Sequence, residues 1–152
     1  MNNNEEITTE ETSQTTDSIT QAINDWLLTR PLISENYDID IEELPDGTKV
    51  LALQRSGVEL IKRYYKGRKE EYQYMLFLKE DSEGDTLKTN NFNWLDNLVD
   101  DIYKQVEERN FPQIEDKQVT SMRCANQITY EVNEDGTISN YAVQLYFTIT
   151  SF

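Results

Sequence analysis

The chain contains no histidine, and this absence excludes more classes of function than any residue that is present. Without imidazole there can be no Ser-His or Cys-His nucleophile system and no histidine-ligated metal site. An enzyme would have to work with carboxylates, lysine, tyrosine or a single thiol. We therefore expect no enzymatic activity, no catalytic residues, no bound cofactor and no metal site.

Cysteine and long apolar runs are also scarce. Cys124 is the only cysteine, so the chain cannot form an internal disulfide, which fits a reducing compartment. We expect Cys124 to be a small strand residue rather than a nucleophile. No stretch approaches about 18 consecutive apolar residues, so no segment is expected to span a membrane.

Positive charge is the third deficit. The sequence has 14 Lys and Arg against 29 Asp and Glu, which gives a formal net charge of −15. A charge of this size favours solubility and repels nucleic acid and anionic membranes at long range. We therefore do not expect the protein to bind DNA or RNA by sequence.

The 152 residues are enough for one domain with a hydrophobic core. After Met1, residues 2–16 of this segment contain one bulky apolar residue, Ile7, among Asn, Glu and Thr. Such a segment cannot bury enough apolar surface to offset the entropy of ordering it, so we expect a disordered acidic and polar tail. Residues 17–152 are expected to form a single domain.

Hydrophobic periodicity predicts an α+β fold. A first helix has Asp17 or Thr16 as its N-cap and stops before Pro31, and a second begins near Asn93. Between them, strands are expected at 37–42, 49–55, 58–65 and 70–79. Ser56-Gly57 is expected to separate the second strand from the third. The third and fourth strands are joined by a hairpin turn at 66–69, and residues 80–91 form an acidic loop. The expected order is α-β-β-β-β-α-β-β, a mostly antiparallel sheet of about five to six strands with two helices packed on it.

The chain closes on a β-hairpin, entered from a strand near 119–124. Residues 127–132 alternate, Asp135-Gly136 provides a tight-turn pair, and residues 137–152 alternate again. One side of the last strand is apolar: Tyr141, Val143, Leu145, Phe147 and Ile149. At ~3.3 Å per residue this strand spans roughly 45–50 Å. We therefore expect it to bend at a bulge or to extend past its own domain and pair with a neighbouring subunit.

Two acidic clusters have the composition of a metal or catalytic site without its pattern. Counting from Asp81, the sixth and twelfth positions of a calcium-binding loop hold Thr86 and Phe92, where Gly and Glu are needed. The second cluster alternates with apolar residues, as the wet face of a strand does: Asp38, Asp40 and Glu42. We interpret both clusters as solvated surface.

A cationic, tyrosine-rich hairpin is the most unusual feature of this acidic chain. Five of the fourteen cationic residues fall within residues 62–69, and tyrosines flank them. Because Tyr and Arg are common anchors of interfaces, we expect this hairpin to dock onto an acidic surface, such as that of an identical subunit. A solvated hairpin with ordinary cross-strand packing is the alternative. The candidate interface residues are Lys62, Arg63, Lys66, Arg68, Lys69, Tyr64 and Tyr72.

Several segments follow one another in a recognisable order. They are a helix ending Trp26-Leu27-Leu28-Thr29-Arg30-Pro31, the run Val50-Leu51-Ala52-Leu53-Gln54-Arg55-Ser56-Gly57, a Tyr-rich hairpin, the helix Asn93-Trp94-Leu95-Asp96-Asn97-Leu98, and Tyr141-Ala142-Val143-Gln144-Leu145-Tyr146-Phe147. In the order and the residue composition of these segments, residues 17–152 resemble the tail terminator proteins of long-tailed bacteriophages, often labelled minor capsid proteins. Residues 1–16 are not part of the resemblance.

The resemblance implies a non-catalytic ring, typically a hexamer, at the head-proximal end of the tail tube. Such a ring stops tube polymerisation and presents a surface for the filled head. The implied partners are further copies, the tail tube protein and the head–tail connector protein, with DNA only passing through the lumen. The implied location is the virion, after assembly in the bacterial cytoplasm. A different class stays open: an acidic inhibitor or immunity-type protein that binds a basic partner or mimics the charge of DNA.

Overall fold

The computed structural model describes residues 17–41, 48–81, 85–125, 129–133 and 136–152. The tail predicted at 1–16 lies outside the described residues, as does Glu42 of the second acidic cluster.

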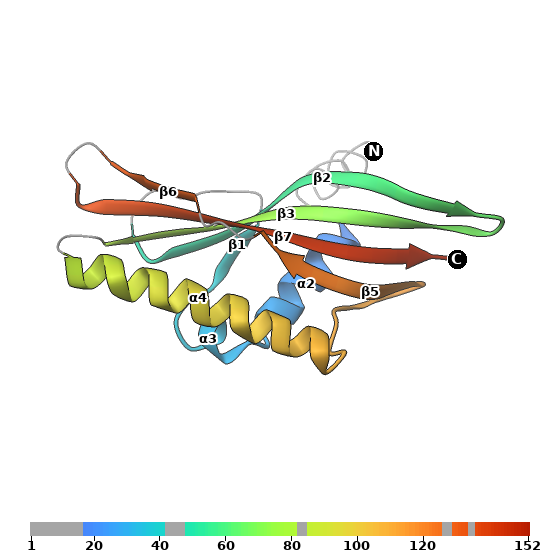
Figure 1. Ribbon diagram of the computed structural model, residues 1–152, viewed down its shortest axis with the longest axis horizontal. Helices are drawn as coiled ribbons and strands as arrows, with labels where there is room; N and C mark the ends of the chain where they lie inside the picture. Colours follow the sequence, from blue (N-terminus) through green and yellow to red (C-terminus); the bar gives the residue numbers. More distant parts are fainter. Residues whose placement is uncertain (1–16, 42–47, 82–84, 126–128, 134–135) are drawn as a thin grey trace, which may run out of the picture.

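A twisted sheet carries the helices on one face (Figure 1). Its strands run in the order β1-β2-β3-β7-β5-β4, with β6 also paired to β7. All pairs are antiparallel except β1 with β2, which is parallel. The helices are α2 (Ser18–Leu27), α3 (Pro31–Ser34) and α4 (Asp85–Glu107), and the strands are β1 (Ile39–Ile41), β2 (Val50–Tyr64), β3 (Gly67–Asp81), β4 (Gln113–Ile114), β5 (Lys117–Cys124), β6 (Thr129–Val132) and β7 (Ile138–Ser151).

The predicted class, α+β with a mostly antiparallel sheet, is confirmed, but the predicted inventory of elements is not. The described residues form three helices and seven strands, in the order α-α-β-β-β-α-β-β-β-β. Two of the additions, α3 and β4, have four and two residues. Elements this short have no hydrophobic period that a sequence pattern could reveal.

α2 forms where it is predicted because its ends are chemically defined. The Asp17 carboxylate accepts a hydrogen bond from the Thr20 amide at 2.8 Å, which satisfies a free N–H of the first turn. Ile23 and Leu27 are fully buried against the sheet. This helix ends at Leu27, before Pro31 as predicted, and Pro31 begins α3, since proline is tolerated at the first helical position.

The core lies between the helices and one face of the sheet. Alternate residues of β3 and β7 point into it, each exposed by 8% or less: Tyr72, Tyr74, Leu76, Leu78, Tyr141, Val143, Leu145, Phe147 and Ile149. Met75 and Phe77 of β3 lie on the other face and are half-buried. The predicted apolar side of β7 is therefore confirmed, and β3 shows the same alternation.

β7 is an interior strand with no bulge of its own, so both predicted alternatives, a bend at a bulge and an extension past the domain to pair with a neighbouring subunit, are wrong. It pairs with β3 along its whole length, from Ile138 opposite Asp81 to Ser151 opposite Arg68. Its other side pairs with β5 and β6. The physical reason is that β3 has fifteen residues against fourteen in β7, so the closing strand finds a partner of its own length within the chain.

β2 runs without interruption through Ser56-Gly57, where the sequence predicts a break. Its register against β3 shifts between Arg55 and Gly57, so that Ser56 is the extra residue of a β-bulge. A second shift between Leu60 and Lys62 leaves Ile61 as another extra residue. A bulge absorbs one residue without ending the pairing, which joins two predicted strands into one.

α4 begins at Asp85, two turns before the predicted start near Asn93, so most of the predicted acidic loop is helix. The Asn91 side chain donates a hydrogen bond to the Tyr141 hydroxyl at 3.2 Å. The Phe92 ring packs edge-on against Tyr141, with centroids 5.1 Å apart. These contacts with the sheet stabilise the polar first turns of α4. The sequence does not predict these turns as helix because they have no apolar period.

Candidate functional site

The acidic side chains of the described residues do not gather into a metal centre. Within this part of the chain, no three or more His, Cys, Asp or Glu side chains are placed to hold a metal ion. Asp38 and Asp40 are exposed, as the solvated-surface interpretation requires. Among the described helices, none has the length and apolarity needed to cross a bilayer.

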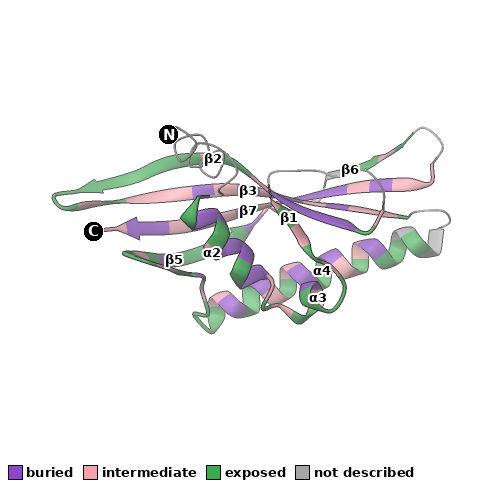
Figure 2. Ribbon diagram, turned by 180° about the vertical axis from the view of Figure 1, so that it is seen from behind, coloured by how far each residue is buried: buried purple, intermediate pink, exposed green. Residues whose placement is uncertain are grey.

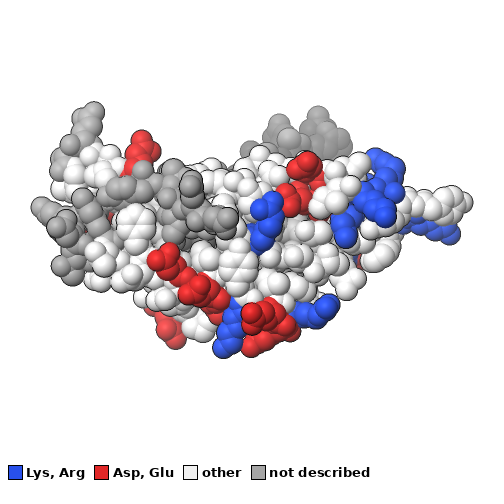
Figure 3. Space-filling view, viewed as in Figure 1, with Lys and Arg blue, Asp and Glu red and all other residues white. Residues whose placement is uncertain are grey.

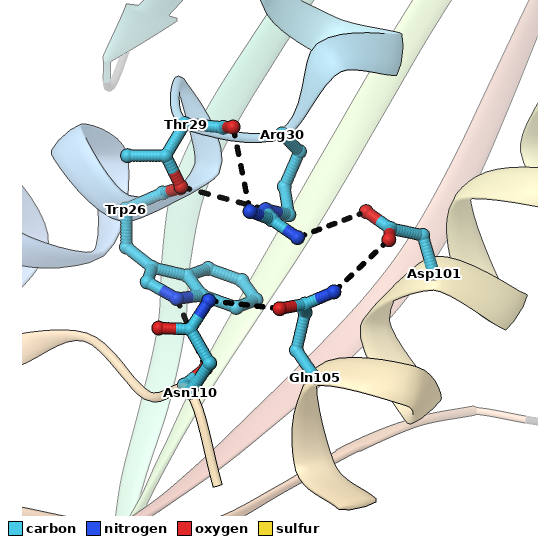
Figure 4. A network of polar contacts seen from close by, with 6 residues as sticks. All are labelled: Trp26, Thr29, Arg30, Asp101, Gln105 and Asn110. Atoms are coloured by element: carbon cyan, nitrogen blue, oxygen red, sulfur yellow. Dashed lines mark hydrogen bonds and ion pairs between the residues drawn. The ribbon is translucent and has the colours of Figure 1, made fainter. Parts of the chain in front are cut away.

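A hollow of about 610 Å³ lies beside α2, with Trp26 in its wall. Trp26 Nε1 donates to the Asn110 carbonyl at 3.1 Å, and Asn110 Nδ2 donates to Gln105 Oε1 at 2.8 Å (Figure 4). Gln105 Nε2 donates to Asp101 Oδ1 at 3.1 Å, and the guanidinium of Arg30 lies 3.5 Å from Asp101 Oδ2. Because these hydrogen bonds and this ion pair join side chains at α2 to side chains at α4, we interpret the network as a structural tie between the two helices.

Exposed apolar side chains concentrate instead in the outer half of the β2–β3 hairpin, residues 58–69, which we call the arm. Figure 2 shows the outer half of β2 exposed. β1 pairs with β2 only opposite residues 51–53, so the edge of β2 within the arm has no strand partner among the described residues. The unpaired N–H and C=O groups of such an edge can pair with another chain. The large apolar side chains of the arm are 39–97% exposed: Val58, Leu60, Ile61, Tyr64 and Tyr65.

Six of the seven predicted interface residues lie together in the arm. Five are exposed and the sixth is half-buried: Lys62, Arg63, Tyr64, Lys66, Arg68 and Lys69. The seventh, Tyr72, is 8% exposed and belongs to the core, with the Arg55 guanidinium 5.7 Å from its ring centre. The alternation of β3 puts Tyr72 on the helix-covered face, so it is not available to a partner.

Like charges face each other across the arm. Lys62 is opposite Lys69, and Arg63 is opposite Arg68. Directly opposed like charges destabilise an antiparallel pair. Of these four cations, Arg68 alone forms an ion pair among the described residues, with Nε 2.7 Å from the Glu70 carboxylate. The arm therefore holds positive charge that its own surroundings do not neutralise, and Figure 3 shows Lys and Arg gathered at this end of the molecule.

The end of β7 packs closely against the arm at Gly67. A Cβ atom at Gly67 would overlap the Ser151 carbonyl oxygen. A hollow of about 460 Å³ lies beside this contact, lined by Tyr65 and by Phe152, which are 97% and 84% exposed. Glycine is required here because the two backbones approach within the space that a side chain would fill.

We expect Gly67→Ala to displace the chain end and to lower the free energy of unfolding by about 1–3 kcal/mol, the usual cost of overpacking. Gly57→Ala is the matched control, because its Cβ would meet only the end of the Gln73 side chain, at 3.3 Å. Urea unfolding of both variants measures the difference. If both variants lost the same free energy of unfolding, the close approach of the Ser151 carbonyl would not be what restricts position 67 to glycine.

Burial fixes the ionisation of two groups in the core. Removal from water raises the pKa of the Cys124 thiol to about 12. The same cause raises the pKa of the Tyr74 hydroxyl, although its hydrogen bond with Thr20 Oγ1, at 2.8 Å, acts in the opposite direction. Cys124 is thus a buried, protonated residue at the end of β5, which confirms the predicted strand role and opposes a nucleophilic one.

Stability is expected to fall in alkali because the folded state holds these two protons more tightly than the unfolded state does. For Cys124 the contribution is complete below the ordinary thiol pKa of 9.0 and is lost as the pH rises through about 12. Urea unfolding at a series of alkaline pH values measures the loss. Cys124→Ala should make the decline shallower, and an identical decline in the variant would rule out the thiol as a contributor.

Sequence reasoning missed that the arm is an uncovered edge. Val58 and Leu60 alternate as they would in a covered strand. The sequence does contain a signal for an edge strand. Lys62 and Arg63 are consecutive, so they place charge on both faces of the strand, and a central strand does not tolerate this. The apolar period of the second predicted helix also predicts that Tyr103 is buried, yet it is 39% exposed.

Comparison with known proteins does not place the chain in a family. No protein-family model matches it, and no curated protein matches it. Its function therefore has to be inferred from the residues and their arrangement.

Proposed function

We propose that this protein is a structural virion protein without catalytic activity, a tail terminator that forms a ring at the head-proximal end of a phage tail tube. The ring stops polymerisation of the tube protein and provides the surface to which the head is joined. Its partners are further copies of itself, as a hexamer in the proteins that it resembles, together with the tube protein and the head–tail connector protein. The observation that carries the proposal is the arm.

The arm has the properties of an assembly element. Its apolar edge would be an aggregation hazard on a protein that stays alone, and folded proteins normally cover or blunt such edges. Here one bulge at Ile61 and another at Ser56, just before the arm, twist the edge, and Lys62 and Arg63 oppose pairing with an identical edge. These features guard the arm against indiscriminate association while leaving it open to a partner of opposite charge. A contact between two different surfaces of identical copies closes into a ring when the rotation permits.

The acidic composition supports the same function. DNA has to slide through a tail without adhering, and a net charge of −15 repels the phosphate backbone. The order of segments across residues 17–152 supports it as well, through the resemblance to tail terminators.

An acidic inhibitor of a basic protein is the second candidate, and the net charge favours it. Such a protein would form a salt-sensitive 1:1 complex and would stay a single chain on its own. The arm counts against this candidate, because a surface that imitates DNA would exclude a cluster of five cations.

Electron microscopy of tails assembled with and without the protein tests the function. With the protein we expect tails of one length, each capped by a ring at the end that meets the head. Without it, tube protein should continue to add and give tails of uncontrolled length. An unchanged distribution of tail lengths would refute the proposal.

A further inference from the structure

We propose that the arm of one copy binds the exposed face of α4 on the next copy, in a head-to-tail contact. The inference rests on the ring function proposed above and specifies the contact that builds the ring.

The net charges indicate that the arm binds the remaining residues of a second copy and not the arm of that copy. Residues 58–69 carry five cationic side chains and one anionic side chain, a net charge of +4. Because the whole chain carries −15, the remaining residues carry −19. A second arm is therefore repelled, whereas the rest of a second copy is attracted. A symmetric dimer joined arm to arm is disfavoured by the same charges.

One face of α4 has the complementary character. Four residues at i, i+4, i+7 and i+11 share this face, which we call the α4 stripe: Asp96, Asp100, Tyr103 and Glu107. All four are exposed, while Leu98 and Ile102 are buried on the opposite side of the helix. The three carboxylates form no ion pair with the other described residues. In Figure 3 much of the acidic surface lies along the rim that α4 occupies in Figure 1.

Tyr103 gives the α4 stripe a fixed apolar centre. Its hydroxyl donates to the Cys124 carbonyl at 3.1 Å and accepts from the Cys124 amide at 3.2 Å. The ring is therefore held in place while 39% of the residue stays exposed. Outside the arm and the chain end, Tyr103 and Leu87 are the large apolar residues exposed in the described part of the chain, and both belong to α4. An aromatic centre within a charged rim is the usual anatomy of an interface.

Binding relieves repulsion on both surfaces. On the arm, the opposed pairs Lys62/Lys69 and Arg63/Arg68 gain anionic neighbours. On α4, Asp96 and Asp100 are one turn apart and repel each other in the free protein. Each surface supplies the charge that the other lacks, so the two are more stable together than apart.

The geometry makes the contact repeat. The arm lies at one end of the sheet, whereas α4 packs against one face of the sheet (Figure 1). Each copy therefore donates an arm to one neighbour and offers its α4 stripe to another. Such a heterologous contact generates a ring if the rotation closes.

Reversing the charge on each side tests the contact. The arm variant carries Lys62→Glu and Lys66→Glu, neither of which removes an ion pair among the described residues. The α4 variant carries Asp96→Lys and Asp100→Lys. Light scattering across protein concentration gives the concentration of half assembly. We expect each variant to raise it at least about tenfold, and the chain that carries all four changes to return to within about threefold of wild type.

A matched control changes the same amount of charge elsewhere. Glu35→Lys with Asp38→Lys alters two exposed carboxylates outside α4 and should shift half assembly by less than about threefold. Circular dichroism verifies that every variant is folded, and a variant that fails this check is replaced by the neutral changes Lys→Gln and Asp→Asn at the same positions. Those neutral changes should weaken assembly in the same direction.

The outcomes separate the contact from the function. Loss of assembly in the control, or no recovery in the four-change chain, overturns the contact. So does a wild-type protein that stays a single chain. In each case tail length, measured by electron microscopy, decides independently whether the protein terminates tails, so the function can survive the loss of this contact.

Discussion

Leu60→Ser is expected to weaken self-assembly strongly while leaving the fold intact. Leu60 is 47% exposed in the arm, so its loss should change the free energy of unfolding by no more than about 0.5 kcal/mol. In an interface the same side chain becomes fully buried, and removing a buried anchor costs about 2 kcal/mol or more. That cost corresponds to a rise of roughly 30-fold in the concentration of half assembly at each contact. Light scattering and urea unfolding measure the two effects separately.

Leu87→Ser is the matched control for Leu60→Ser. Leu87 is exposed to a similar extent, 41%, and lies on a different face of α4 from the α4 stripe. It should leave both assembly and stability unchanged. If both serine variants lost assembly equally, a general apolar attraction would explain the association, and the arm would have no special part in it.

Phe147→Ala is expected to destabilise the folded state by about 3–5 kcal/mol, the cost of a large cavity in a packed core. Phe147 is 2% exposed at the middle of β7, and its ring meets Tyr74 edge-on with centroids 5.8 Å apart. The neighbouring Tyr146 points to the opposite, half-buried face, where the Arg123 guanidinium lies 3.7 Å from its ring centre. Tyr146→Ala should cost much less. Urea unfolding compares the two, and equal costs would contradict the assignment of the core face.

The sequence predicts those features of the fold that depend on neighbouring residues. Asp17 caps α2, and Gly136 takes the positive φ of 74° that a tight turn needs. The alternation of β7 correctly divides its two sides. Each of these features is set within a few residues, by a capping side chain, a glycine or a period of two.

Features of the fold that depend on residues distant in the chain are not predicted by local sequence patterns. Nothing within residues 138–151 indicates that β3 will accompany β7 to its end, which makes β7 an interior strand. Nothing around Ser56 distinguishes a bulge from a break. The early start of α4 depends on Asn91 meeting a tyrosine fifty residues away.

In the candidate site as well, the sequence predicts some of the residues, and others are found only in the structure. Charge composition alone identified the cations of the arm, because five of fourteen fall in eight positions. Tyr72 was assigned to the same surface because of its residue type. The alternation that puts Tyr74 in the core also puts Tyr72 there, so periodicity should have outweighed residue type. The α4 stripe required the structure, since Tyr103 looks like a core residue until its hydroxyl is seen at Cys124.

The mass of the wild-type protein in solution, measured by light scattering at rising concentration, tests most directly whether copies join through the arm. We predict a closed species of several chains that separates into single chains at high salt, where charge contacts are screened, and in the Leu60→Ser variant at any salt. A single chain at every concentration, or a multimer that Leu60→Ser leaves unchanged, would contradict the account.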